Sequence, residues 1–170
     1  MLFSLPGRGG RMDRFSCRRG GWNAPQFFVS SFFAGTLDCR HMKPLREILL
    51  ERVLVGDGGM GTQLMNAGLE QGASGELWNI DEPDKVVAIQ RRYVEAGSDG
   101  LISNTFSANG LMLDRHCLRD RLAEINRAAV EVARRAFAEG GREGWVLGDV
   151  GPVGGVLEMW GGDVTDEQAR

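Results

Sequence analysis

The chain has 170 residues, of which 42% are hydrophobic and 25% are charged, and its formal net charge is −3. This composition is typical of a soluble globular protein and argues against a disordered one. No apolar run approaches the ~18 residues needed to cross a bilayer. We therefore expect neither a membrane nor a nucleic acid as a partner.

The cysteines are Cys17, Cys39 and Cys117. They are too few and too scattered for a disulfide scaffold, which fits a reducing compartment and predicts a cytoplasmic protein. Neither these thiols nor the two histidines have the spacing of known zinc motifs. We expect no metal site built from these groups alone.

The first residues differ in composition from the rest of the chain. Residues 1–43 hold seven basic and two acidic side chains, and residues 1–41 show no sustained period of 2 or 3.6. We interpret residues 1–41 as a disordered or non-native N-terminal extension. An organelle transit peptide is one explanation. We favour an early-assigned start with Met42 as the true initiator, because helical patterning begins immediately after it.

Residues 42–170 are predicted to fold as one domain. Pro44 opens an apolar stripe at helical spacing, and residues 53–56 predict a buried strand. The glycine-rich turn 56–62 follows. The pattern then predicts a short helix over 63–67, a loop over 69–80, a helix over 83–96, a strand beginning at Gly100, a helix over 119–139, a strand over 145–148 and a helix opening at Thr165.

The body thus reads as a helix followed by β-α-β-α-β, which indicates an α/β fold with a parallel sheet. Polar side chains follow each predicted strand: Asp57, then Asn104 and Thr105, then Asp149. The carboxyl ends of parallel strands meet at one edge, where such folds bind their ligands. We expect these side chains to face one rim.

The first turn also matches G-x-G-x-x-G at Gly56, Gly58 and Gly61, the pattern of a dinucleotide-binding loop. That interpretation needs an acidic residue about 20 positions later, at the end of the second strand. Asp81 has this separation but caps a helix. In addition, Asp57 would place a negative charge opposite a negative pyrophosphate. The context of the motif therefore argues against a phosphate site.

A carboxylate at the mouth of a strand is better suited to a ligand ammonium. Asp57 could bind the ammonium of a free amino acid, while the neighbouring glycine N–H groups and Thr105 could bind its carboxylate. The alternative for each single residue is structural, since strand-end Asp and Asn side chains often satisfy loop backbone or cap the next helix. Three such positions in register favour a binding site.

Several segments in order resemble the homocysteine S-methyltransferase family. They are Gly56-Asp57-Gly58-Gly59-Met60-Gly61-Thr62, Glu76-Leu77-Trp78-Asn79, Ala96-Gly97-Ser98-Asp99, Asn104-Thr105-Phe106-Ser107-Ala108-Asn109, Glu124-Ile125-Asn126 and Gly148-Asp149-Val150-Gly151-Pro152. The resemblance runs from about Pro44 to Gly162. It implies an eight-stranded β/α (TIM) barrel that transfers a methyl group to the sulfur of homocysteine, giving methionine.

By this similarity, Asp57 would hold the homocysteine ammonium, and the Gly58 backbone with the Asn104-Thr105 segment would place the carboxylate. Asp149 would lie on the same rim. The resemblance also implies zinc, which activates the substrate thiol. Betaine, methyl-folate acting through cobalamin and S-methylmethionine all remain open as methyl donors, so cobalamin or folate could enter through other domains.

The family's zinc cysteines, one alone and two in a Gly-Gly-Cys-Cys motif near later strands, are absent here. Three strands also cannot close an eight-stranded barrel. We expect the chain to be the truncated N-terminal part of the barrel of a zinc-dependent homocysteine S-methyltransferase, inactive alone. A non-catalytic truncated product and a small nucleotide-binding α/β domain remain as alternatives.

Overall fold

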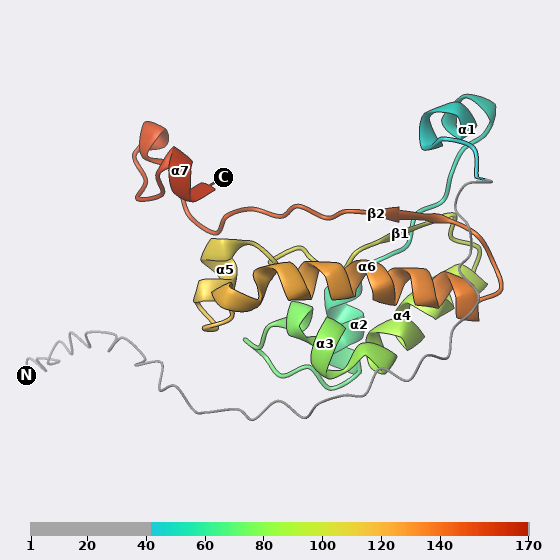
Figure 1. Cartoon of the computed structure of the whole chain (residues 1–170), viewed down its shortest axis with the longest axis horizontal. Coiled ribbons are helices and arrows are strands. Elements are labelled where there is room, and N and C mark those ends of the chain that lie inside the picture. The colour runs from blue at the N-terminus through green and yellow to red at the C-terminus, as the bar shows by residue number, and fades with distance from the viewer. Residues whose placement is uncertain (1–41, 170) are drawn as a thin grey trace, which may run out of the picture. The chain divides into compact units, whose positions relative to one another are not determined.

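The computed structural model describes residues 42–169, and the extension predicted over 1–41 lies outside them (Figure 1). The strands are β1 (Gly100–Ile102) and β2 (Trp145–Leu147). The helices are α1 (Leu45–Glu51), α2 (Met60–Asn66), α3 (Trp78–Asp81), α4 (Pro83–Glu95), α5 (Gly110–Asp114), α6 (Leu122–Glu139) and α7 (Asp166–Ala169), with 3₁₀ turns η2 (Gly75–Leu77), η3 (Arg119–Arg121) and η4 (Glu158–Trp160).

The sheet is small and parallel. β1 and β2 pair with Leu101 opposite Val146. Residues 53–57 run along the other side of β1, joined by a single parallel bridge from Gly56 to Gly100. The three segments therefore lie in chain order across the sheet, as β-α-β units require.

The prediction of a buried strand over 53–56 is wrong in two respects. The segment makes one bridge and no ladder, and Val53 and Val55 are 86% and 58% exposed. An apolar run predicts burial only if another layer covers it. Among the described residues, the nearest helix along the chain, α1, has no buried residue.

Arg52 and Asp99 hold this first segment beside β1. The Arg52 guanidinium donates to both Asp99 carboxylate oxygens at 2.9 Å, and the Val55 N–H donates to the same carboxylate at 3.0 Å. The Arg52 hydrogen bonds, and then that from Val55, lower the pKa of Asp99 to about 2. The Arg52–Asp99 ion pair thus holds residues 53–57 beside β1, where a single backbone bridge gives little support.

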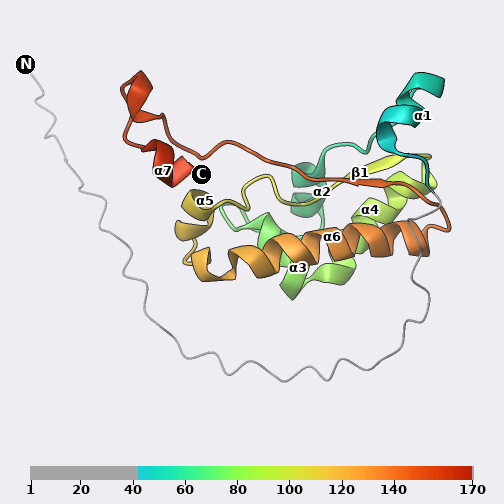
Figure 2. The same cartoon turned by 45° about the horizontal axis from the view of Figure 1, so that its top comes forward.

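One face of the sheet is covered by α4 and α6, which lie on the same side of the strands in both views (Figures 1 and 2). Leu101 of β1 is fully buried, whereas Ile102, on the opposite face, is 41% exposed. The core between the layers consists of Leu64, Val86, Val87, Ile89, Val94, Leu101, Val132, Ala133, Ala136 and Phe137. The apolar stripes of two amphipathic helices thus supply most of the core.

Local signals explain where the helices begin and end. Pro83 occupies the first turn of α4, and Gly97 with φ 109° follows its end, as predicted. Asn109 caps α5 by accepting a hydrogen bond from the Met112 N–H at 3.0 Å. The predicted loop over 69–80 is wrong in part, because it contains η2 and α3.

An α/β fold with a small open parallel sheet is therefore confirmed. The described residues form only part of what an eight-stranded barrel requires, so the barrel stays a prediction. No helix among residues 42–169 is long and apolar enough to cross a membrane.

Candidate functional site

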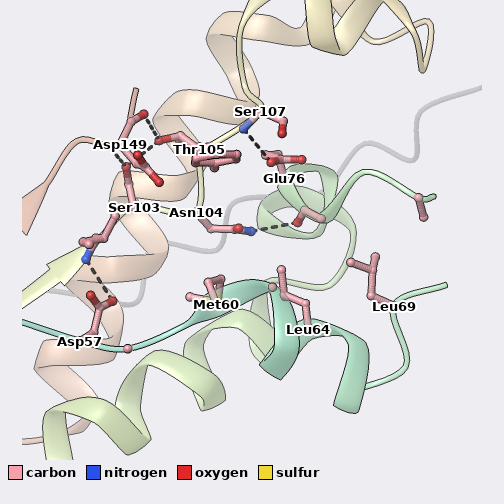
Figure 3. A pocket seen from close by; sticks show the side chains of 16 residues that line it. Asp57, Met60, Leu64, Leu69, Glu76, Ser103, Asn104, Thr105, Ser107 and Asp149 are labelled. Carbon is pink, nitrogen blue, oxygen red and sulfur yellow. Dashed lines mark hydrogen bonds between the residues drawn. The ribbon is translucent and has the colours of Figure 1, made fainter. Parts of the chain in front are cut away.

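A pocket of about 400 Å³ lies at the carboxyl ends of the three parallel segments (Figure 3). All five residues singled out from the sequence line it: Asp57, Gly58, Asn104, Thr105 and Asp149. The other lining residues are Met60, Gly61, Leu64, Leu69, Ala73, Gly75, Glu76, Ile102, Ser103, Phe106 and Ser107. The structure thus brings the predicted rim residues together.

The lining is acidic on one part and apolar on another. Asp57, Glu76 and Asp149 supply carboxylates, and none of the lining residues is basic. Apolar side chains, Leu64 and Leu69 among them, complete the wall. Unlike charges attract most strongly where solvent is excluded. The pocket therefore suits a small ligand with a cationic end and an aliphatic part.

Asp57 is the least satisfied of these polar groups. Its Oδ2 accepts a hydrogen bond from the Ile102 N–H at 3.1 Å, but Oδ1 is shielded from solvent and accepts none. Burial raises the pKa of Asp57 against the opposing effects of the Ile102 N–H and of its own backbone N–H, and the negative charge of Asp149 adds a smaller upward contribution. A cation placed here would reduce the cost of keeping this carboxylate ionised.

Ser103, Thr105 and Asp149 form a closed ring of hydrogen bonds across the ends of β1 and β2. The Thr105 hydroxyl donates to the Asp149 carbonyl at 2.8 Å. Because a hydroxyl has one proton, Ser103 must be the donor in its 2.8 Å contact with Thr105. The Asp149 N–H then donates to Ser103 at 3.1 Å. All three protons of the ring are committed within the protein.

The Asn104 side chain is similarly committed. Its amide nitrogen donates to the Gly75 carbonyl at 2.8 Å and to Asn79 Oδ1 at 3.1 Å. The Asn79 amide returns a hydrogen bond to the Asn104 carbonyl at 2.8 Å. An amide nitrogen has two protons, so Asn104 has no side-chain proton left to donate to a ligand.

Gly58 is confined by an aromatic ring. A Cβ at this position would lie 3.0–3.3 Å from atoms of the Tyr93 ring, whereas one at Gly59 would meet nothing within 4 Å. The Tyr93 hydroxyl donates to the Gly59 carbonyl at 3.1 Å and so holds the ring in place. The absence of a side chain at Gly58 therefore serves packing against Tyr93.

The dinucleotide interpretation finds no support in this geometry. Asp81 is the last residue of α3, exposed and not at the end of a strand. Asp57 places its carboxylate in the pocket wall where a phosphate would have to bind. Both features oppose the placement of a negatively charged dinucleotide.

The sequence left two features of the site unrecognised. Glu76, which is 8% exposed, lies in one of the family-like segments, but the resemblance assigns it no role, and no sequence pattern singles out Ser103. A polar residue next to Asn104 in a strand-end cluster was the available signal for Ser103. Within residues 42–169 no group of three or more His, Cys, Asp or Glu side chains could hold a metal ion.

Comparisons with known proteins agree on one family. The sequence profile of the homocysteine S-methyltransferases matches residues 54–170. The methionine synthases of Mycobacterium tuberculosis and Mycobacterium leprae are 39% and 38% identical to the chain over 117 residues, which is 64% of this chain. The chain spans only 10% of the length of these relatives.

The fold comparison gives the same answer. The homocysteine methyltransferase MmuM from Escherichia coli matches in its metallated form, with a TM-score of 0.53 and 26% identity, and in its oxidized form, with a TM-score of 0.54 and 27% identity. The matches cover 65% and 66% of this chain and 42% of MmuM. Because the family's sequence profile matches residues 54–170, the chain belongs to the homocysteine S-methyltransferase family.

Proposed function

We propose that this chain supplies the homocysteine-binding part of a methyltransferase that converts homocysteine to methionine, as the N-terminal portion of an eight-stranded β/α barrel. One observation carries the proposal. The pocket of this chain is acidic, has no basic lining residue and contains Asp57, whose Oδ1 accepts no hydrogen bond. Such a pocket needs a cationic group near Asp57 and an apolar part against the aliphatic wall. A free amino acid with an aliphatic side chain has both.

In this proposal Asp57 binds the ammonium group of homocysteine. The methylene groups lie against the apolar wall formed by side chains such as Leu64 and Leu69. The ligand carboxylate is bound by backbone N–H groups at Gly58 and Asn104. Their side chains cannot do so, because one is absent and the other donates both amide protons within the protein.

Thr105 and Asp149 have a supporting role in this scheme. The Thr105 hydroxyl proton is committed to the Asp149 carbonyl, so Thr105 shapes the rim rather than donating to the ligand. Asp149 adds negative charge to the pocket, which favours the ammonium end of the substrate over its carboxylate end.

The resemblance implies zinc for the methyl transfer itself, which would lower the pKa of the homocysteine thiol and so supply a thiolate. The described residues offer no cluster for such an ion, and we derive no step through it. The methyl donor, whether an onium compound or methyl-folate acting through cobalamin, stays a question for the whole protein.

The test is a calorimetric titration of the 170-residue chain with L-homocysteine under reducing conditions. We expect Asp57→Asn to weaken binding by about tenfold or more, since a hydrogen bond to a charged group contributes about 1.5–3 kcal/mol. Asp163→Asn, at an exposed position away from the pocket, should bind like the wild type. The analogue 4-sulfanylbutanoate, which lacks the ammonium, should not compete.

Absence of homocysteine binding by the wild-type chain would overturn the proposal. Equal affinity of the wild type and Asp57→Asn would also overturn it, because the ammonium would then bind elsewhere.

A further inference from the structure

We infer that Glu76 is a positioning residue of the pocket, which holds residues 104–107 in the conformation that a ligand requires. The ligand-related part of this inference rests on the proposed function. The structural part stands on the contacts of Glu76 alone. Neither the strand-end rule nor the resemblance gave this residue a role.

Glu76 lies in η2 and is 8% exposed. Its Oε1 accepts a hydrogen bond from the Ser107 N–H at 2.9 Å (Figure 3). Its Oε2 accepts one from the Ser74 hydroxyl at 3.0 Å. Through Oε1, the carboxylate joins the turn before α3 to the loop after β1. The contact of Oε2 with Ser74 lies within the turn and orients the carboxylate.

The same two segments are joined by amide hydrogen bonds next to Glu76. Asn104 donates to the Gly75 carbonyl and to Asn79, and Asn79 donates to the Asn104 carbonyl, at 2.8–3.1 Å. With the Glu76–Ser107 contact, four hydrogen bonds hold this loop from one side. The strand before the loop, β1, has only three residues. The backbone ladder alone gives the loop little support. These side chains therefore hold it from one side, and the ring of Ser103, Thr105 and Asp149 holds it from the other.

The nature of the contacts defines what Glu76 contributes. No basic residue lines the pocket, and both carboxylate oxygens accept from neutral donors. A glutamine can reproduce this arrangement, because its oxygen can accept from the Ser107 N–H and its amide can donate to Ser74. An aspartate keeps the charge but is one methylene shorter. Length and hydrogen-bonding capacity should therefore matter more than charge.

The test compares Glu76→Ala, Glu76→Gln and Glu76→Asp in the 170-residue chain, with Glu131→Ala on the exposed face of α6 as the control. Hydrogen exchange of the peptide covering residues 103–109 is measured without ligand. We expect exchange about tenfold faster in the alanine and aspartate variants, and within about threefold of wild type in the glutamine variant and the control.

Homocysteine titration of the same proteins provides the second readout. Affinity should fall about tenfold in the alanine and aspartate variants and stay near wild type in Glu76→Gln. Should Glu76→Ala not fold, the aspartate and glutamine variants still decide the question. Unchanged exchange in Glu76→Asp would overturn the inference, as would a glutamine variant as impaired as the aspartate one. Failure of the proposed function would instead appear as no homocysteine binding by the wild type.

Discussion

The replacement Asp57→Asn should make the folded chain more stable while weakening its ligand binding. In the wild type, Oδ1 of this carboxylate is shielded and accepts no hydrogen bond, and only the Ile102 N–H reaches Oδ2. Burial penalises an ionised carboxylate more than a neutral amide. Asparagine can still accept from Ile102 and carries no charge, although its amide nitrogen takes the place of Oδ1 without gaining a partner. Because the side chain is only half-buried, solvent screens part of the cost of the charge, and we expect a gain of no more than about 1 kcal/mol.

The pH dependence provides an independent check on this reasoning. The pKa of Asp57 is raised above 3.8 in the folded chain, chiefly by burial. The folded state therefore holds the proton more tightly than the unfolded state. The cost of the ionised carboxylate is present above the raised pKa and disappears as the pH falls toward 3.8. The stability difference between Asp57→Asn and wild type should shrink over the same range.

Urea unfolding followed by circular dichroism measures both quantities, near neutral pH and at about pH 4. The exposed replacement Asp163→Asn should change the free energy of unfolding by less than about 0.5 kcal/mol. A variant Asp57→Asn that is less stable than wild type at neutral pH would refute the reasoning. It would show that the carboxylate is satisfied within the free protein and is not held ready for a cation.

Three further replacements test the surroundings of the pocket. Asp99→Asn should lower the free energy of unfolding by about 1–2 kcal/mol, a value discounted because the arginine partner is half-exposed. The pKa of Asp99 in the folded chain is about 2, so this stabilisation should be complete above about pH 4 and lost as the pH falls toward 2. Acid titration of the wild type and the variant measures this loss. Thr105→Val should cost about 1–3 kcal/mol in urea unfolding, because it leaves two ring partners unsatisfied, whereas Thr105→Ser should cost less. Gly58→Ala should destabilise the chain by about 1 kcal/mol through its contact with Tyr93, while Gly59→Ala, which faces open space, should change the melting temperature little.

The longest helices could be predicted from the sequence because their patterns extend over several turns. α4 has 13 residues and α6 has 18, and both bury one apolar stripe. Proline and glycine marked the ends of α4 as predicted. An apolar period of 3.6 residues over three or more turns fits a helix and no other regular structure.

The short elements could not be predicted in the same way. α3 has four residues and η2 has three, too few for a helical period to be seen. They are held by hydrogen bonds of Asn79 and Glu76, one buried and one partly buried, to a loop that lies 25 and 31 positions further along. Only tertiary structure brings those partners together. The prediction of a buried strand over residues 53–56 is wrong for a different reason. Their apolar pattern predicts burial, but the described residues contain no layer that covers them.

The positions of the site residues followed from the strand-end rule, but their hydrogen-bonding roles did not. Asp57, Asn104, Thr105 and Asp149 all reach one pocket. Which of them can still bind a ligand depends on where each proton goes. The sequence pattern suggests Thr105 as a donor to a carboxylate, whereas the structure directs its hydroxyl proton to the backbone of Asp149.

Hydrogen-bond satisfaction therefore separates two kinds of polar group in this pocket. Glu76, Thr105 and the amide of Asn104 have all their relevant donors or acceptors engaged, so their loss should be felt in stability and loop order first. Asp57 has an oxygen without a partner and a raised pKa, so near neutral pH the free protein bears the cost of its charge, and a cationic ligand would relieve that cost. A carboxylate that lowers the stability of the empty protein is most simply explained by a ligand that it binds. The proposed function therefore depends on Asp57.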